Sequence, residues 1–157
     1  MSWSFQIRNG DLNWGGPGGF ATVSGRQKLI QDLRNWLTEP RGTDSFHPDY
    51  GSVLDGGIGP TGTEVDYLIG NVVSEEGMMQ IEAEVRRILA AYQQQQSDRL
   101  NNDIIKYSGK NTFGLDEILL QVEDVTVENY QDVVLVTVTL LTGSGNQISF
   151  TSPVASI

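Results

Sequence analysis

Four carboxylates share one predicted loop, and paired carboxylates are the groups that cleave sugar bonds. The loop runs from residue 39 to residue 62, is rich in Gly, Pro, Asp and Ser, and carries Glu39, Asp44, Asp49 and Asp55. One carboxyl of such a pair protonates the glycosidic oxygen while the other acts as base or nucleophile. However, an acidic chain gathers loop carboxylates by chance, and the sequence supplies no apolar pocket that would raise the pKa of one of them. A glycosidase that uses these loop carboxylates is therefore only an alternative hypothesis.

Other catalytic groups are sparse. The chain has one histidine and no cysteine, which excludes thiol nucleophiles, disulfides and thiolate metal sites. His47 has no nucleophile elbow to serve, and we expect it to bond to the backbone. The segment 57–62 has the outer glycines of a phosphate loop but lacks the Lys that reaches the phosphates. We predict no catalytic residue, no cofactor and no metal, and a ligand-binding domain that uses the 56–63 loop is a third hypothesis.

The charge pattern argues against nucleic acid and membrane as partners. The 157 residues include 20 acidic and 10 basic ones, for a formal net charge of −10. Phosphate contacts require clustered Lys and Arg, and an anionic membrane surface repels such a chain. The longest apolar run, Val133–Leu141, is too short for a membrane helix, and the first residues do not read as a signal peptide. Residues 111–157 hold six acidic groups and no basic one, which discourages self-association and favours a less acidic or basic partner.

The candidate residues of the 39–62 loop would be positioned by an extended arm and three helices. Residues 1–23 read as short extended pieces around a glycine-rich turn, and residues 24–157 read as one domain. Ser24 and Gln27 fit a capping box ahead of a helix over residues 25–38. A second helix is predicted over residues 64–73. A third begins after Ser74, with a buried stripe of Met78, Ile81, Val85, Ile88 and Tyr92.

The rest of the chain has the pattern of strands. Residues 117–127 are rich in β-forming residues, with a bulge predicted where Glu123 and Asp124 break the alternation. Residues 132–142 are apolar on both faces, which indicates a central strand or a partner covering the second face. A Gly-Ser-Gly-Asn turn leads into a last strand over residues 147–152. We therefore predict an α+β fold: an N-terminal arm and three helices followed by a C-terminal antiparallel β-meander.

Two neighbouring segments carry a known signature. Leu37–Gly42 reads Leu-Thr-Glu-Pro-Arg-Gly, and Phe46–Leu54 reads Phe-His-Pro-Asp-Tyr-Gly-Ser-Val-Leu. A helix ending in Leu-Thr, a glycine, then Pro-x-Tyr-Gly-Ser and an apolar residue resembles the small baseplate wedge protein of contractile phage tails, whose counterpart in type VI secretion is TssE. The resemblance covers residues 20–152. The family's Glu-Pro-Arg normally lies before the strands; here those letters follow the first helix, and by position Arg99 is the retained cation.

The resemblance implies a structural assembly protein rather than an enzyme. Because tail baseplates often carry cell-wall-cleaving enzymes, a lysozyme-like cell-wall glycosidase that uses the loop carboxylates is the alternative. It implies a wedge subunit that surrounds the tube in the virion's tail baseplate, made in the host cytoplasm, whose C-terminal strands initiate sheath polymerisation. The implied partners are the tail sheath protein, other baseplate wedge proteins, and tail tube or hub proteins. The expected partner-interface residues are Arg99, Val134, Val136, Val138, Ile148 and Phe150, and the signature loop is Pro48, Tyr50, Gly51 and Ser52.

Overall fold

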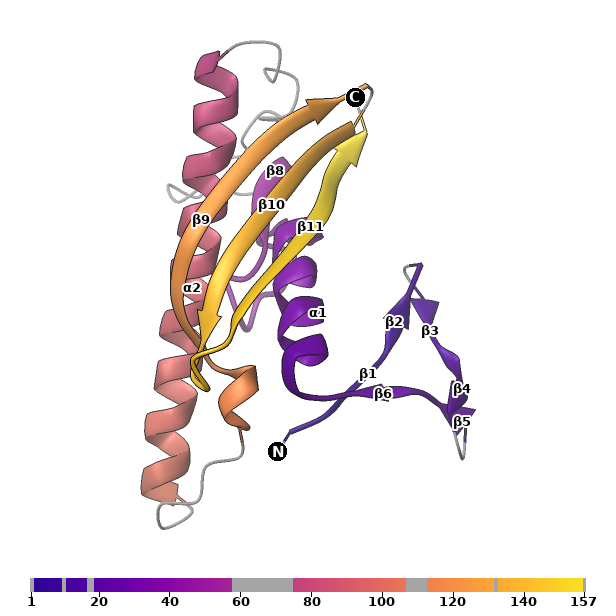
Figure 1. Ribbon diagram of the computed structural model, residues 1–157, viewed down its shortest axis with the longest axis vertical. Helices are drawn as coiled ribbons and strands as arrows, with labels where there is room; N and C mark the ends of the chain where they lie inside the picture. Colours follow the sequence, from indigo (N-terminus) through magenta and orange to yellow (C-terminus); the bar gives the residue numbers. More distant parts are fainter. Residues whose placement is uncertain are drawn as a thin grey trace.

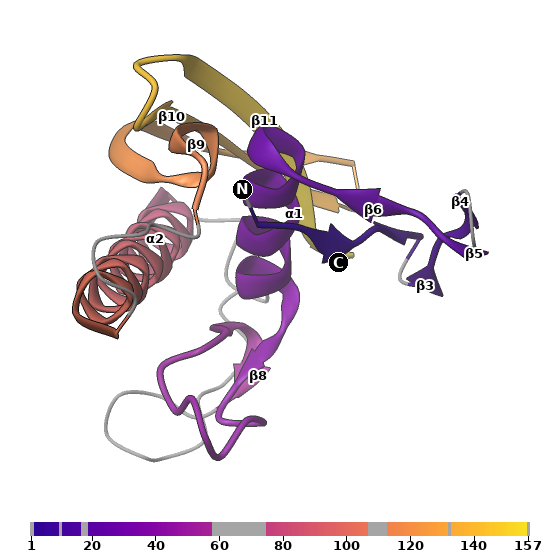
Figure 2. The same ribbon diagram turned by 90° about the horizontal axis from the view of Figure 1, so that it is seen from below.

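The computed structural model describes residues 2–9, 11–16, 19–57, 75–106, 113–131 and 133–156. A curved three-stranded sheet lies over two helices, and a slender N-terminal arm projects to one side (Figure 1; Figure 2 shows the same arrangement from below). The arm contains six short strands: β1 (Ser4–Phe5), β2 (Ile7–Arg8), β3 (Asp11–Leu12), β4 (Trp14–Gly16), β5 (Gly19–Phe20) and β6 (Thr22–Val23). They pair antiparallel as β1 with β6, β2 with β3, and β4 with β5.

The arm is joined to the first helix by one side-chain amide. Gln31 Nε2 donates to the carbonyl of Phe5 at 2.8 Å, and Gln31 Oε1 accepts from the backbone N–H of Ile7 at 2.8 Å. A single amide thus forms the same pair of hydrogen bonds that a neighbouring strand would form. Along the arm, aromatic rings meet edge to face, and Trp3 and Trp14 remain 64% and 72% exposed.

Helix α1 (Gly25–Thr38) has the predicted bounds and buries Leu29, Leu33, Trp36 and Leu37 on one face. The predicted capping box is wrong, because the side chain of Ser24 makes no cap hydrogen bond. The carboxylate of Glu117 takes that place and accepts from the backbone N–H of Gly25 at 3.0 Å. An anion at a helix N-terminus satisfies a free donor and favours the helix dipole, so a distant residue supplies the cap.

The segment after α1 folds back on the helix end. Strands β7 (Pro40–Arg41) and β8 (Ser52–Gly57) pair in parallel. Gly51 connects into β8 with φ of +91°, and a Cβ there would lie 2.6 Å from the carbonyl oxygen of Glu39. Only glycine fits such a conformation against a neighbouring backbone, which gives the glycine of the signature loop a structural reason.

Helix α2 (Glu75–Lys106) is 32 residues long and begins with Glu75 and Glu76 in its first turn. The predicted stripe is confirmed, because Ile81, Val85 and Ile88 are fully buried and Tyr92 is 7% exposed. The helix continues through the glutamine tract at residues 93–96 and ends at Lys106. The helix predicted over residues 64–73 lies outside the described residues.

The C-terminal strands form one antiparallel sheet in the order β11-β10-β9. Its strands are β9 (Leu119–Tyr130), β10 (Val133–Thr142) and β11 (Gln147–Ser156), preceded by the 3-10 helix η2 (Leu115–Glu117). The predicted bulge is confirmed: Thr139 pairs with Asp124 and Leu140 with Val122, so the register skips Glu123.

One face of this sheet packs on both helices and forms the core. Its buried side chains are Leu119 and Val125 of β9, Val134, Val136, Val138 and Leu140 of β10, and Ile148, Phe150 and Val154 of β11. The opposite face carries hydroxyl pairs, Thr137 with Thr151 at 2.9 Å and Thr139 with Ser149 at 3.2 Å. The same face also carries Val133, Leu135 and Leu141 of β10, which are partly buried. Strand β10 is therefore apolar on both faces, and it is the central strand of the sheet, as predicted.

The predicted architecture needs a correction. The class is α+β in coarse terms, but the plan of an arm, three helices and then a meander is wrong. The described residues contain two α-helices, and small strand pairs lie both before α1 and between α1 and α2, one of them parallel. The extended pieces of the arm were predicted, but the pairing of these strands was not. Most of the strands are two or three residues long and carry no periodic pattern, so neighbouring segments define them.

Candidate functional site

The free edge of β11 can be mapped from its hydrogen bonds. The backbone N–H of Thr142 donates to the carbonyl of Asn146 at 2.9 Å where the β10–β11 hairpin closes. Backbone groups alternate in direction along a strand, so the even-numbered residues of β11 bond to β10. The odd-numbered residues, Gln147, Ser149 and Thr151, therefore direct their backbone N–H and C=O groups away from the sheet.

Two further observations agree with this direction. The carbonyl of Thr151 accepts a hydrogen bond from Arg34 Nη2 at 3.1 Å, which places it toward α1. Pro153, which has no N–H to donate, is also odd-numbered and pairs with Leu135 across the ladder. Proline is tolerated in a strand where its nitrogen faces the free edge. Among the described residues, β11 thus ends the sheet with an unpaired edge.

A groove of about 940 Å³ borders this edge. Its walls are the β11 residues Ser149–Pro153, the face of α1 that carries Ile30 and Arg34, and the arm on both sides of Ile7. Figure 1 shows β11 as the strand of the sheet nearest to the arm. An extended segment laid in this groove would reach the open backbone N–H and C=O of Ser149 and the backbone N–H of Thr151.

Arg34 is the charged residue of this groove: the other residues that line it are neutral. Its guanidinium lies 5.8 Å from the centre of the Phe150 ring and donates to Thr151. Within the described part of the chain, Arg34 forms no ion pair. The stacking and the single hydrogen bond hold the cation at the edge, and other N–H groups of the guanidinium stay available as donors.

The apolar residues predicted for a partner interface lie in the core. Val134, Val136 and Val138 are fully buried, and Ile148 and Phe150 are 8% and 5% exposed. Their side chains pack in the core against the helices, so they leave little side-chain surface for a partner. Arg99 lies apart from these residues, exposed on α2.

The signature loop is fastened to both helices. Ser52 Oγ donates to the carbonyl of Leu37 at 2.8 Å, and Arg87 Nη2 donates to the carbonyl of Gly51 at 3.1 Å. Glu84, which is 8% exposed, accepts from the backbone N–H of Val53 at 3.0 Å and pairs with Arg87 at 2.7 Å. The loop therefore fixes the end of α1 against α2.

The other signature residues lie on the outer part of the loop. The carbonyl of Pro48, which is exposed, accepts from Arg41 Nε at 3.4 Å. The ring of Tyr50 meets that of Trp36 edge to face at 4.9 Å. Burial, together with the charges of Glu39, Asp32 and Asp44, raises the pKa of Tyr50 to about 12, so the phenol stays protonated at physiological pH.

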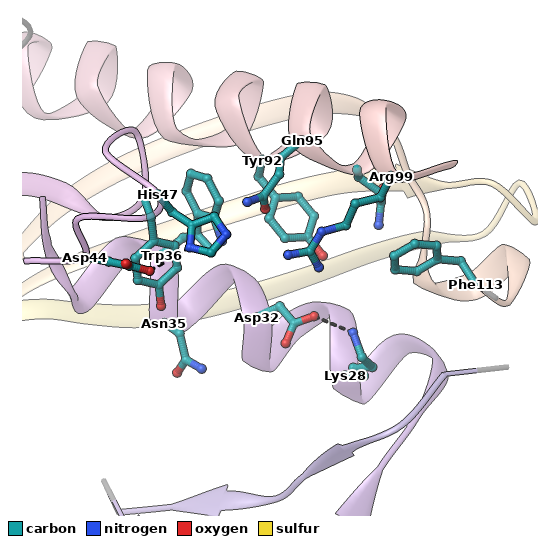
Figure 3. A pocket seen from close by; sticks show the side chains of 12 residues that line it. Lys28, Asp32, Asn35, Trp36, Asp44, His47, Tyr92, Gln95, Arg99 and Phe113 are labelled. Carbon is teal, nitrogen blue, oxygen red and sulfur yellow. Dashed lines mark hydrogen bonds and ion pairs between the residues drawn. The ribbon is translucent and has the colours of Figure 1, made fainter. Parts of the chain in front are cut away.

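A second, smaller pocket of about 270 Å³ lies between α1, α2 and the loop (Figure 3). Arg99 extends into it from α2 with its guanidinium beside Tyr92, and Phe113 lies on its far side. Burial raises the pKa of Tyr92, with the charge of Asp32 adding to the effect. Asp32 itself is paired with Lys28 at 2.7 Å. The pocket thus mixes aromatic walls with charges of both signs.

Among the loop carboxylates whose side chains the structure describes, Asp44 and Asp49 each bind a neighbouring side chain. Asp44 accepts from His47 Nδ1 at 2.7 Å and from the N–H of Phe46 at 2.9 Å, and these hydrogen bonds lower its pKa. A general acid requires the opposite shift. Asp49 is paired with Arg41 at 2.7 Å, Glu39 is exposed, and the side chain of Asp55 and residues 58–63 lie outside the described residues.

A metal-binding cluster and a membrane-spanning helix are both absent from the described residues. These residues contain no group of three or more His, Cys, Asp or Glu side chains placed to hold a metal ion. They also contain no helix with the length and apolar character needed to cross a membrane.

Sequence reasoning missed Arg34, Gln31 and Glu117. Each is a common polar residue with no motif around it, and each acquires its role from a partner far along the chain: Arg34 from Thr151, Gln31 from the arm, and Glu117 from Ser2 and Gly25. No local spacing signals such contacts.

Comparison of the chain with protein-family models, with curated proteins and with solved structures found no match.

Proposed function

We propose that this protein is a non-enzymatic assembly subunit of a contractile-tail baseplate, and that its β11 edge receives a strand from the tail sheath protein. The single observation that carries the proposal is the unpaired β11 edge beside a groove of about 940 Å³. The resemblance of the signature loop to baseplate wedge proteins supplies the biological setting. In that setting the protein acts in the virion, next to other wedge proteins and to tube or hub proteins.

Strand addition fits the chemistry of this edge. An added strand gains main-chain hydrogen bonds, and side-chain contacts along the groove give specificity. An edge that stays open must also resist pairing with copies of itself. Pro153 removes one donor, Arg34 occupies the Thr151 carbonyl, and the exposed acidic residues of β9, Glu123, Asp124 and Glu128, repel a second sheet.

The test compares Ser149→Pro with Ser149→Ala in sheath nucleation. Both variants remove the Ser149 hydroxyl that Thr139 contacts, but only proline removes the outward N–H and places a ring where an added strand would lie. The ladder to β10 uses the even-numbered residues, so both variants are expected to fold. Each is mixed with purified sheath subunit of the same particle, and sheath polymerisation is followed by light scattering and electron microscopy.

We expect the wild-type chain and Ser149→Ala to shorten the lag before sheath polymerisation. Ser149→Pro should reduce nucleation by about tenfold or more, because at least one hydrogen bond is lost and the ring excludes the strand. Equal nucleation by both variants would show that β11 is not the receiving edge. A wild-type chain that neither binds nor nucleates sheath would overturn the assembly function itself.

A further inference from the structure

We propose that the strand received at β11 carries an Asp or Glu that pairs with Arg34, so that the groove selects acidic segments over basic ones. This inference rests on the proposed function, since it names the chemistry of the segment that binds at the same edge. It concerns selectivity, which strand addition alone does not determine.

The charge distribution is the first argument. The chain has a formal net charge of −10, and the exposed side of β9 carries Glu123, Asp124 and Glu128. The groove differs, because Arg34 is charged and the remaining lining residues are neutral. A basic segment would be attracted to the β9 side of the sheet but would meet a like charge at β11. A carboxylate would meet its complement there.

The placement of Arg34 is the second argument. Its guanidinium is held over Phe150 and bonded to the carbonyl of Thr151, at the open edge itself. In an added strand, the residue opposite Phe150 has its side chain on the same face of the sheet as Phe150, which is the α1 face over which Arg34 lies. A carboxylate at that position, turned toward α1, can accept two hydrogen bonds from a guanidinium fork that is already oriented.

The neutral amides of α1 are the third argument. Gln31 of this helix binds the extended backbone of the arm at Phe5 and Ile7 through both its donor and its acceptor. Gln27 and Asn35 line the same groove with further amides. These neutral groups can bond to any extended backbone, so they favour a strand without favouring either charge. Discrimination by charge therefore falls to Arg34.

The experiment uses three synthetic peptides that differ only at the central residue. Each is about seven residues long, the usual length of a strand, alternates Thr and Val, is capped at both ends, and has Glu, Gln or Lys at the centre. Binding of the labelled peptides to the full-length chain is measured by fluorescence anisotropy, and amide exchange at Ser149 and Thr151 locates the site. The variants are Arg34→Glu and Arg34→Gln, with Ser149→Pro to report on the edge.

For the wild-type chain we expect the Glu peptide to bind about tenfold more tightly than the Lys peptide, with Gln between them. Arg34→Glu should invert this order, and Arg34→Gln should remove the preference. Arg86→Glu is the matched control, because it makes the same charge change at an exposed position of α2 paired with Glu82, and the order should survive. Ser149→Pro should weaken the binding of all three peptides to the same extent.

Two outcomes would overturn the inference. If the three peptides bind equally and Arg34→Glu leaves them unchanged, Arg34 does not select the strand, whereas the edge itself remains supported by the effect of Ser149→Pro. If none of the peptides binds or protects Ser149 and Thr151, the groove does not take a separate acidic strand. The sheath-nucleation comparison of Ser149→Pro and Ser149→Ala then decides the proposed function independently.

Discussion

Replacing Glu117 by Gln tests how the N-terminal arm is held to the body. The carboxylate is 1% exposed and accepts four hydrogen bonds: from Ser2 Oγ at 2.6 Å, Ser2 N at 3.3 Å, Gly25 N at 3.0 Å and Gly114 N at 3.1 Å. It therefore joins the chain's beginning, the start of α1 and the start of η2. The amide of Gln has one oxygen, so its NH₂ group must face donors that the carboxylate satisfied.

The expected cost follows from these bonds. A hydrogen bond to a charged group contributes roughly 1.5–3 kcal/mol, and a buried donor left without a partner costs about 1–3 kcal/mol. Glu117→Gln leaves at least one of the four donors unsatisfied. We expect it to lower the free energy of unfolding by about 2–3 kcal/mol at pH 7, and to increase the exchange of the Ser2 and Gly25 amides.

The pH dependence gives an independent check. Burial disfavours the ionised form of Glu117, but the hydrogen bonds from Ser2, Gly25 and Gly114 outweigh it and lower the pKa of the carboxyl. A carboxyl whose pKa is lower in the folded chain adds stability above its unfolded pKa of about 4.3, and that stability is lost as pH falls through the folded pKa. The difference between wild type and Glu117→Gln should therefore shrink between pH 5 and pH 3.

The assay is urea unfolding followed by circular dichroism at pH 7, 5, 4 and 3. Glu82→Gln is the control, since it makes the same chemical change in an exposed pair with Arg86 at 2.8 Å, and should change stability by less than about 0.5 kcal/mol. A Glu117→Gln effect as small as that of the control, or one that stays constant down to pH 3, would refute the anchoring role of Glu117.

Three other substitutions test the signature loop and the core of α2. For each, urea unfolding measures the loss in the free energy of unfolding. Gly51→Ala should cost about 2 kcal/mol or more, because the φ of Gly51 is +91° and the added Cβ meets backbone atoms. The control Gly145→Ala, with φ of +81° and open space around it, should cost about 1 kcal/mol. Equal costs for the two variants would contradict this account. Glu84→Ala leaves the backbone N–H of Val53 without its acceptor and should cost about 2–3 kcal/mol, and a neutral result would remove Glu84 from the support of the signature loop. Leu89→Ala, at a fully buried position of α2, should cost about 3 kcal/mol, and a cost under about 1 kcal/mol would mean that the core repacks there.

The helices show how much of the fold can be predicted from the local sequence pattern. The bounds of α1 were predicted correctly, and Leu29, Leu33 and Trp36 recur on its buried face at the helical period. The buried stripe of α2 was also predicted, but nothing in the sequence marks any residue of the glutamine tract at 93–96 as buried. In the folded chain Gln96 is 4% exposed, donating to the carbonyl of Glu117 at 2.7 Å and accepting from the N–H of Leu119 at 2.8 Å. A polar side chain with two buried partners looks the same in sequence as a solvated one.

The strand predictions divide in the same way. The central position of β10 and the bulge at Glu123 were predicted correctly. The sequence does not say which face of β10 packs on the helices, so the burial of Val134, Val136 and Val138 is known only from the fold. The two-residue strands of the arm and the parallel pair β7–β8 break the plan of three helices followed by a meander. Such short pairs depend on neighbouring segments for their hydrogen bonds.

The sequence by itself determined the acidic charge, the lack of cysteine chemistry, and the apolar periodicities that build α1, α2 and the three C-terminal strands. Those features are local or compositional, so the chain carries them before it folds. Only the tertiary structure decided that Glu117 caps α1, that β11 is the open edge, and that Arg34 is the cation beside it. The hydrogen bonds of Glu117 to Ser2 and of Arg34 to Thr151 span 115 and 117 positions of the chain. Contacts of that length are set by how the elements pack, because no residue spacing within one element can specify them.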